Sequence, residues 1–181
     1  MRSALVLMTM TLVLWACGED AGTGAAADPA PGAAQAAQLG AEALAAIDAC
    51  SLLTGEEVRA ILGQDATGQE DADSGFDLAC SWNAPAPPGM QRAFAEQEVS
   101  VEVARLEPEA VLRDQYNAFK ENMAFREDVS DVGAEAFLAE YISGSALVIR
   151  TDSLLVFLNT GEPDQEAMLK QLGPTVLNRL R

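Results

Sequence analysis

The sequence contains no histidine, only three cysteines and few positive charges. The missing histidine removes the commonest general base and the commonest neutral metal ligand. The 11 Lys and Arg residues against 28 Asp and Glu residues give a net charge of −17, which repels nucleic acid and anionic lipid surfaces. A Gly-x-Ser-x-Gly motif, a phosphate-binding glycine loop and a Cys/His nucleophile pair are also missing. We therefore expect a monomer that is not an enzyme, uses no cofactor or metal and binds no nucleic acid.

A long membrane-spanning run is missing as well. The apolar run from Ala4 to Trp15 has about a dozen residues, whereas a hydrocarbon core of ~30 Å needs about 20. Arg2 before this run gives the charged and apolar regions of a secretory signal peptide. The run ends in Leu14-Trp15-Ala16-Cys17, which resembles the lipobox of bacterial lipoproteins. The resemblance implies a signal peptide over 1–16 and a mature chain that begins with lipidated Cys17, carrying diacylglycerol and a further acyl chain such as palmitate. The alternative is a simple secreted protein in which Cys17 is incidental.

The residue after Cys17 is Gly18, whereas the lipoprotein sorting rule uses Asp at this position for retention in the inner membrane. The resemblance therefore implies the periplasmic face of the outer membrane if the cell has one, and otherwise the outer face of the plasma membrane. Residues 17–47 are rich in Ala, Gly and Pro, which is typical of a tether. A flexible coil of about two dozen residues would hold a domain roughly 25–30 Å from the membrane. We expect one folded domain over 48–181.

The first half of this domain shows one helix and two strands. Thr54 and Glu57 form a capping box, and Gly63 provides a left-handed C-cap, so a helix is predicted between them. Residues 64–77 are expected to form a polar loop. Period-two alternation predicts strands over 78–84 and 98–106, the second with one solvated side.

The second half shows a longer helix, several strands and a closing helix. Apolar residues at spacings of three and four predict a helix after Pro108. Strands are expected over 128–133 and 134–142, followed by a hairpin of 146–150 and 154–159. Within this hairpin 154–158 is apolar on both faces and is expected to be the central strand. The last helix should open at Glu162 and kink at Gly173-Pro174. This order predicts an α+β fold, an antiparallel sheet with helices packed on one face, and a weak internal α-β-β duplication.

Cys50 and Cys80 are the only thiols left in an exported, lipidated chain. An oxidising compartment favours a disulfide between them, which would stabilise the fold by about 3–4 kcal/mol on the chain-entropy model. A metal pair and a redox pair are the alternatives. They fit less well, because two cysteines without histidine make a poor zinc site and the CxxC spacing is missing.

Three motifs lie along this region: Asp48-Ala-Cys50-Ser-Leu-Leu-Thr-Gly-Glu-Glu-Val58, Cys80-Ser-Trp82 and Asp131-Val-Gly-Ala-Glu-Ala-Phe137. With them the chain resembles, over nearly the whole folded region, a group of short bacterial lipoproteins best known from actinobacteria. Members of that family often have proline where this chain has Ala49. The resemblance implies an envelope-anchored α/β domain without assigned catalysis, and it provides no functional residue.

Few other residues suggest chemistry. Asp71, Asp73 and Asp77 alternate loosely like a calcium loop, but position 75 is glycine and the later bidentate glutamate is missing. We favour a solvated acidic loop. Glu135 is the best candidate for a partly buried carboxylate. A hydrogen bond from Glu135 to a turn would be sufficient to explain its burial without a functional role. Trp82, next to the cysteine, is expected in the core.

These features predict a lipid-anchored cell-envelope protein that acts by binding. Its partner would be another envelope protein or a small apolar ligand held between sheet and helices, and its contact with the membrane would be the lipid on Cys17. The alternative is a structural or stress-related envelope protein without a discrete ligand. A hydrolase ranks last.

Overall fold

The computed structural model describes residues 42–85, 96–141, 144–162 and 164–181. The expected signal peptide, the lipidation site at Cys17 and the tether as far as residue 41 lie outside the described residues. Within the described ranges, no helix has the length and apolar character needed to cross a membrane.

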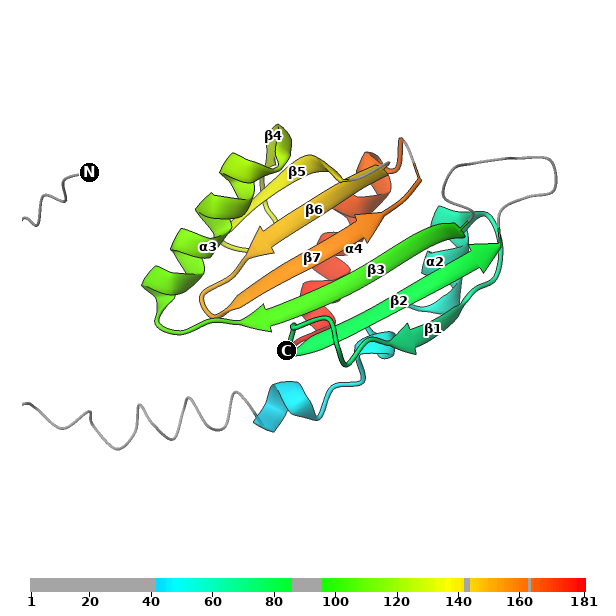
Figure 1. Cartoon of the computed structure of the whole chain (residues 1–181), viewed down its shortest axis with the longest axis horizontal. Helices are drawn as coiled ribbons and strands as arrows, with labels where there is room; N and C mark the ends of the chain where they lie inside the picture. Colours follow the sequence, from blue (N-terminus) through cyan, green and yellow to red (C-terminus); the bar gives the residue numbers. More distant parts are fainter. Residues whose placement is uncertain (1–41, 86–95, 142–143, 163) are drawn as a thin grey trace, which may run out of the picture.

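Seven antiparallel strands form one sheet (Figure 1). They are β1 (Thr67–Glu70), β2 (Leu78–Pro85), β3 (Glu96–Arg105), β4 (Ala124–Val129), β5 (Glu135–Tyr141), β6 (Gly144–Arg150) and β7 (Leu154–Thr160). Their order is β1-β2-β3-β7-β6-β5-β4, so one meander of β1 to β3 joins a second of β4 to β7 where β3 pairs with β7. The expected hairpin is β6 with β7, and β7 is the central strand as predicted.

Helices cover both faces of this sheet. The helical elements are a turn at 42–45, η1 (Ala49–Ser51), α2 (Gly55–Leu62), α3 (Glu109–Asn122) and α4 (Glu166–Arg179). Helices α2 and α4 lie behind the sheet in Figure 1, and their buried side chains share a core with Val101 and Leu158. Helix α3 packs on the opposite face, where Leu112 and Tyr116 share a second core with Phe137. The α+β class and the antiparallel sheet are confirmed.

The expectation that all helices pack on one face is wrong. In β7, Leu155 and Phe157 point to the α3 side and Val156 and Leu158 point to the other, and all four are buried. Because such strands are apolar on both sides, each side must be covered from water. The predicted duplication is seen only as a repeated order of a helix followed by an antiparallel meander, and the meanders have three and four strands.

The start and end of α2 follow the prediction. Glu57 N donates to Thr54 Oγ1 at 3.3 Å, and Thr54 N donates to Glu57 Oε2 at 2.7 Å, which completes the capping box. Gly63 adopts φ 69° and ends the helix. The apolar stripe that includes Val58 and Ile61 is buried against the sheet, so local signals were sufficient here.

Two edge strands differ from the expectation. Strand β1 lies inside the predicted polar loop, pairs with β2 at one edge of the sheet and has mostly exposed side chains. Strand β4 begins at Ala124, directly after α3, whereas the predicted strand over 128–133 is mostly a turn with Asp131 at φ 64° and Gly133 at φ 66°. An edge strand with exposed side chains carries no apolar alternation, which is why the pattern did not reveal either one.

The last helix begins later than expected, at Glu166, and continues through Pro174. Gly173 brings it close to the sheet, because a Cβ at this position would lie 2.9 Å from Leu147 Cδ2 and 3.0 Å from Val132 Cγ1. The helix therefore packs on β6 through a residue that has no side chain.

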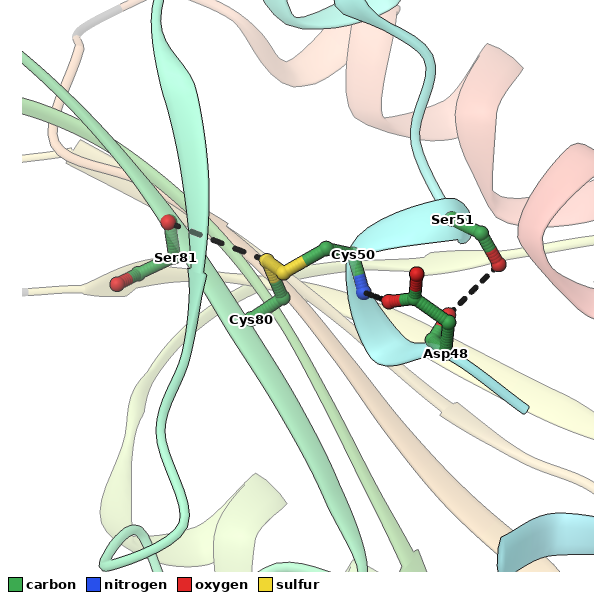
Figure 2. The surroundings of a disulfide bond; sticks show 5 residues. All are labelled: Asp48, Cys50, Ser51, Cys80 and Ser81. Atoms are coloured by element: carbon green, nitrogen blue, oxygen red, sulfur yellow. Dashed lines mark hydrogen bonds between the residues drawn. A yellow bond between two sulfur atoms is a disulfide. The ribbon is translucent and has the colours of Figure 1, made fainter. Parts of the chain in front are cut away.

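A Cys50–Cys80 disulfide links η1 to β2 (Figure 2). The Asp48 carboxylate accepts a hydrogen bond from Cys50 N at 2.8 Å, and the Ser51 hydroxyl donates to Asp48 O at 2.6 Å. These contacts fix the short helix that presents Cys50 to the strand. The predicted disulfide is confirmed. Leu44, six residues before Cys50, is already part of the core.

Candidate functional site

The acidic loop does not form a cluster. Asp71 Oδ1 accepts a hydrogen bond from Asp73 N at 3.1 Å, while Asp77 Oδ2 accepts one from Arg105 N at 2.5 Å. In the part of the chain that the structure describes, no three Asp, Glu, Cys or His side chains are grouped so as to hold a metal ion. These carboxylates therefore serve the loop and its junction with β3.

Glu135 was expected to be partly buried, but it is an exposed residue with 52% of its side chain accessible to solvent. Its Oε2 accepts a hydrogen bond at 2.9 Å from Nε of Arg150, which is itself buried. The explanation by a hydrogen bond to a turn is also wrong. Trp82, in contrast, lies in the core as predicted.

A groove on the α3 side of the sheet is the site with the most chemical content. It has a volume of about 430 Å³ and lies between the end of α3, the start of β4 and the ends of β5 and β7. We call it the α3-side groove. Its apolar lining consists of Phe76, Phe119, Met123, Ala124, Tyr141 and Phe157, and its polar lining consists of Glu102, Asn122, Glu140 and Asn159.

Three phenylalanines from distant segments form one wall of the groove. Phe157 of β7 contacts Phe76, from the loop before β2, with ring centroids 5.5 Å apart and planes at 72°. It also contacts Phe119 of α3, with centroids 4.7 Å apart and planes at 77°. These edge-to-face contacts hold the rings in a fixed arrangement. Tyr141, which is 39% exposed at the end of β5, also lines the groove.

The polar side of the groove comes from two paired strands. Residue Asn159 of β7 pairs with Ser100 of β3, and Glu102 pairs with Phe157 in the next position on the same face. The side chain of Asn159 is almost completely buried, and its Nδ2 donates to Ser100 Oγ at 2.8 Å. Its Oδ1 is buried without a hydrogen-bond partner in the described part of the chain. The groove therefore contains a buried polar atom that lacks a donor.

Glu102 is the more buried of the two carboxylates in this lining, and Glu140 is exposed. Burial raises its pKa above the ordinary value of 4.5, and the negative charges of Glu98 and Asp71 add to the rise, opposed by a hydrogen bond from the Asn159 side chain. Burial also raises the pKa of Tyr141, and the charges of Glu102 and Glu98 raise it further. Of these two carboxylates, Glu102 lines the same groove as Tyr141.

The polar groups of the α3-side groove are the carboxylates of Glu102 and Glu140 and the amides of Asn122 and Asn159, which can accept and donate hydrogen bonds and attract a positive charge. Its apolar groups can bury a small organic body in the way that ligand pockets usually do. Apolar and polar groups therefore line the same groove.

A second hollow lies at the C-terminal end of α4. It has a volume of about 630 Å³ and is lined by the β4–β5 turn, the β6–β7 turn and the last residues of the helix. Among the described residues that line it, no side chain is both buried and without a hydrogen-bond partner. Although this hollow is larger than the α3-side groove, it offers fewer buried polar groups that would orient a ligand.

The residues of the α3-side groove were not singled out from the sequence. Glu102 was placed on the solvated side of its strand, but that side is half covered, with Ser100 buried and Glu102 partly exposed. Two weak signals were present, namely a glutamate inside an alternating valine strand and Asn159 at the end of the most apolar strand. Neither signal reveals that Glu102 and Asn159 lie close together, because their proximity depends on the pairing of β3 with β7.

No protein-family model, no curated protein and no solved structure matches this chain.

Proposed function

We propose that this chain is a lipid-anchored cell-envelope protein of a non-catalytic, binding type, and that the α3-side groove takes a small ligand with an apolar body. The observation that carries the proposal is the buried Asn159 Oδ1 at a groove with aromatic walls. A buried polar atom without a partner costs about 1–3 kcal/mol, so such atoms are uncommon in folded proteins unless a ligand or water satisfies them.

The shape of the site favours a small molecule over a protein partner. The groove is concave, with a volume of about 430 Å³, which lies in the usual range for small-molecule sites. Its deepest polar group, Asn159, belongs to the central strand, where a flat protein surface would not reach it.

The anchoring part of the proposal rests on the leader. Arg2, the apolar run and Leu14-Trp15-Ala16-Cys17 support export and lipidation of Cys17, and the Cys50–Cys80 disulfide supports an oxidising compartment. A tether over residues 17–47 would hold the domain, and the groove with it, roughly 25–30 Å from the membrane.

Blocking the groove tests the binding function. Ala124 is exposed and lines the groove, so Ala124→Trp should fill it without removing a core contact. Ala60, exposed on α2 at the opposite face, provides the matched Ala60→Trp control. The full chain in nanodiscs of phosphatidylcholine is dialysed against radiolabelled 2-phenylethylammonium, 2-phenylethanol and 3-phenylpropionate, with empty nanodiscs subtracted.

Saturable binding of at least one probe to the wild type and to Ala60→Trp, lost in Ala124→Trp, is expected. If no probe binds saturably, or if Ala124→Trp binds as well as the control, the groove is not a ligand site. The structural or stress-related alternative would then be preferred.

Lipidation is tested separately with Cys17→Ser. The wild type should stay with the membrane fraction after a high-salt wash, and the variant should be released from it. A variant that remains in the membrane fraction would contradict anchoring through Cys17.

A further inference from the structure

We propose that the ligand of the α3-side groove is a primary organic ammonium ion with an aromatic or aliphatic body. This rests on the proposed binding function and names the chemical class that the lining of the same groove selects. The juxtaposition behind it is the carboxylate of Glu102, the free Oδ1 of Asn159 and the aromatic rings at one groove.

The charge of the groove is negative. Glu102 and Glu140 line it, and the lining that the structure describes includes no Lys or Arg. Glu140 is paired with Arg126 from outside the lining, with Nη2 3.7 Å from Oε2, so the negative charge of the groove comes mainly from Glu102. The two groups whose charges act on the Glu102 carboxylate, Glu98 and Asp71, are also acidic. In residues 42–85, 96–141, 144–162 and 164–181 no ion pair to Glu102 is formed, so this half-buried carboxylate lacks a counter-ion that a cationic ligand would supply.

The hydrogen-bonding groups of the groove call for a donor. Glu102 offers carboxylate oxygens, and Asn159 offers Oδ1, while the Asn159 Nδ2 already donates to Ser100. A primary ammonium group has three N–H donors and no acceptor. It can therefore serve both residues at once, whereas an anion or an aprotic cation cannot.

The aromatic rings suit both ends of such a molecule. Faces of aromatic rings attract cations, and their surfaces bury apolar groups. In the proposed complex Phe119 and Phe157 would contact the apolar body of the ligand. Tyr141 would lie near the ammonium group, because the charges of Glu102 and Glu98 also act on its hydroxyl. The net charge of −17 further raises the concentration of cations near the surface of the protein.

The three dialysis probes share a phenethyl body and differ in charge and donors, and the N,N,N-trimethyl derivative of 2-phenylethylammonium is added as a cation without donors. We expect 2-phenylethylammonium to bind at least about tenfold more tightly than 2-phenylethanol or the trimethyl derivative. A hydrogen bond between charged groups contributes enough binding free energy to change the affinity by about this factor. The 3-phenylpropionate ion should bind most weakly.

Glu102→Gln tests the role of the carboxylate. This variant should lose about tenfold or more in affinity for 2-phenylethylammonium and should bind 2-phenylethanol as the wild type does. Glu56, exposed on α2 at the far face, provides the control Glu56→Gln, which should change neither affinity. Tyr141→Leu, at a partly exposed position, should weaken ammonium binding by about two- to fivefold.

The outcomes separate the two proposals. If 2-phenylethanol or 3-phenylpropionate binds saturably and as tightly as 2-phenylethylammonium, or if Glu102→Gln leaves ammonium binding unchanged, the ammonium assignment is overturned while the groove remains a ligand site. If no probe binds, the proposed function itself fails.

Discussion

Arg179, at the end of α4, binds both carboxylate oxygens of Glu57, in the first turn of α2. Its Nη1 lies 2.7 Å from Glu57 Oε2, and its Nη2 lies 2.9 Å from Glu57 Oε1. The same Oε2 accepts the Thr54 N–H of the capping box, and Arg179 Nη1 also donates to Leu52 O at 2.7 Å. One ion pair therefore joins the start of α2 to the end of α4.

Arg179→Met should lower the free energy of unfolding by about 1–2 kcal/mol, because it removes a bidentate pair and leaves the Leu52 carbonyl without this donor. Arg113→Met is the matched control. Arg113 pairs with Glu109 on the exposed side of α3, and the loss of such a pair should cost less than about 0.5 kcal/mol. Urea unfolding measures both, and equal losses would contradict the role given to Arg179.

The stability of the protein should fall with acid partly because of Glu57. Burial raises the pKa of Glu57, but hydrogen bonds from Arg179 and Thr54 outweigh it and hold the pKa below the ordinary value of 4.5. The folded state then binds fewer protons than the unfolded state, so stability that is present above pH 4.5 is lost as the pH falls through the folded pKa. In Glu57→Gln the free energy of unfolding should depend less steeply on pH below 4.5. An unchanged slope between wild type and variant would contradict this.

Glu102 should act in the opposite direction. Its raised pKa means that the folded state binds more protons than the unfolded state, so stability is lost as the pH rises from 4.5 through the folded pKa. Glu102→Gln removes the half-buried charge and its repulsion by Glu98 and Asp71, so we expect a higher melting temperature at pH 7. A lower melting temperature would show that the carboxylate is needed for folding.

Gly173→Ala should destabilise the protein by about 1 kcal/mol, although alanine is the better helix former. The added methyl group would meet Leu147 and Val132 at 2.9 and 3.0 Å in a packed interface. Gly55→Ala, in the first turn of α2, places its Cβ in open space and should be neutral or slightly stabilising. Thermal unfolding of the two variants should therefore shift in different directions.

Replacing both Cys50 and Cys80 by alanine should lower the free energy of unfolding by about 3 kcal/mol, because the bond closes a loop with a sequence separation of 30. Chemical denaturation of the oxidised wild type, the reduced wild type and the double variant measures the effect. The reduced wild type should resemble the double variant. If the stabilities of the oxidised and reduced wild type agree, the disulfide does not hold η1 on the sheet.

Short-range chemistry made several features predictable from the sequence. The capping box of Thr54 and Glu57 and the left-handed Gly63 are decided within a few residues of chain, and period-two alternation identified β2 and β3. Two β-rich runs separated by a short turn identified the β6–β7 hairpin. The cysteine pair could be predicted because few partners were available. The helix and strand signals depend on neighbours along the chain, and the cysteine pairing depends on composition.

Only the tertiary structure decided the groove and the arrangement around the sheet. Strands β1 and β4 escaped prediction because edge strands need no apolar alternation, and the place of α3 depended on which face of β5 to β7 remained uncovered. Glu102 and Asn159 meet because β3 and β7 pair in one register, across a separation that no local pattern encodes. The sequence by itself determined α2, β2, β3 and the β6–β7 hairpin through local hydrogen bonds and residue patterns, and it left the two cysteines few other partners. The site, in contrast, required the long-range pairing that brings distant side chains to one face.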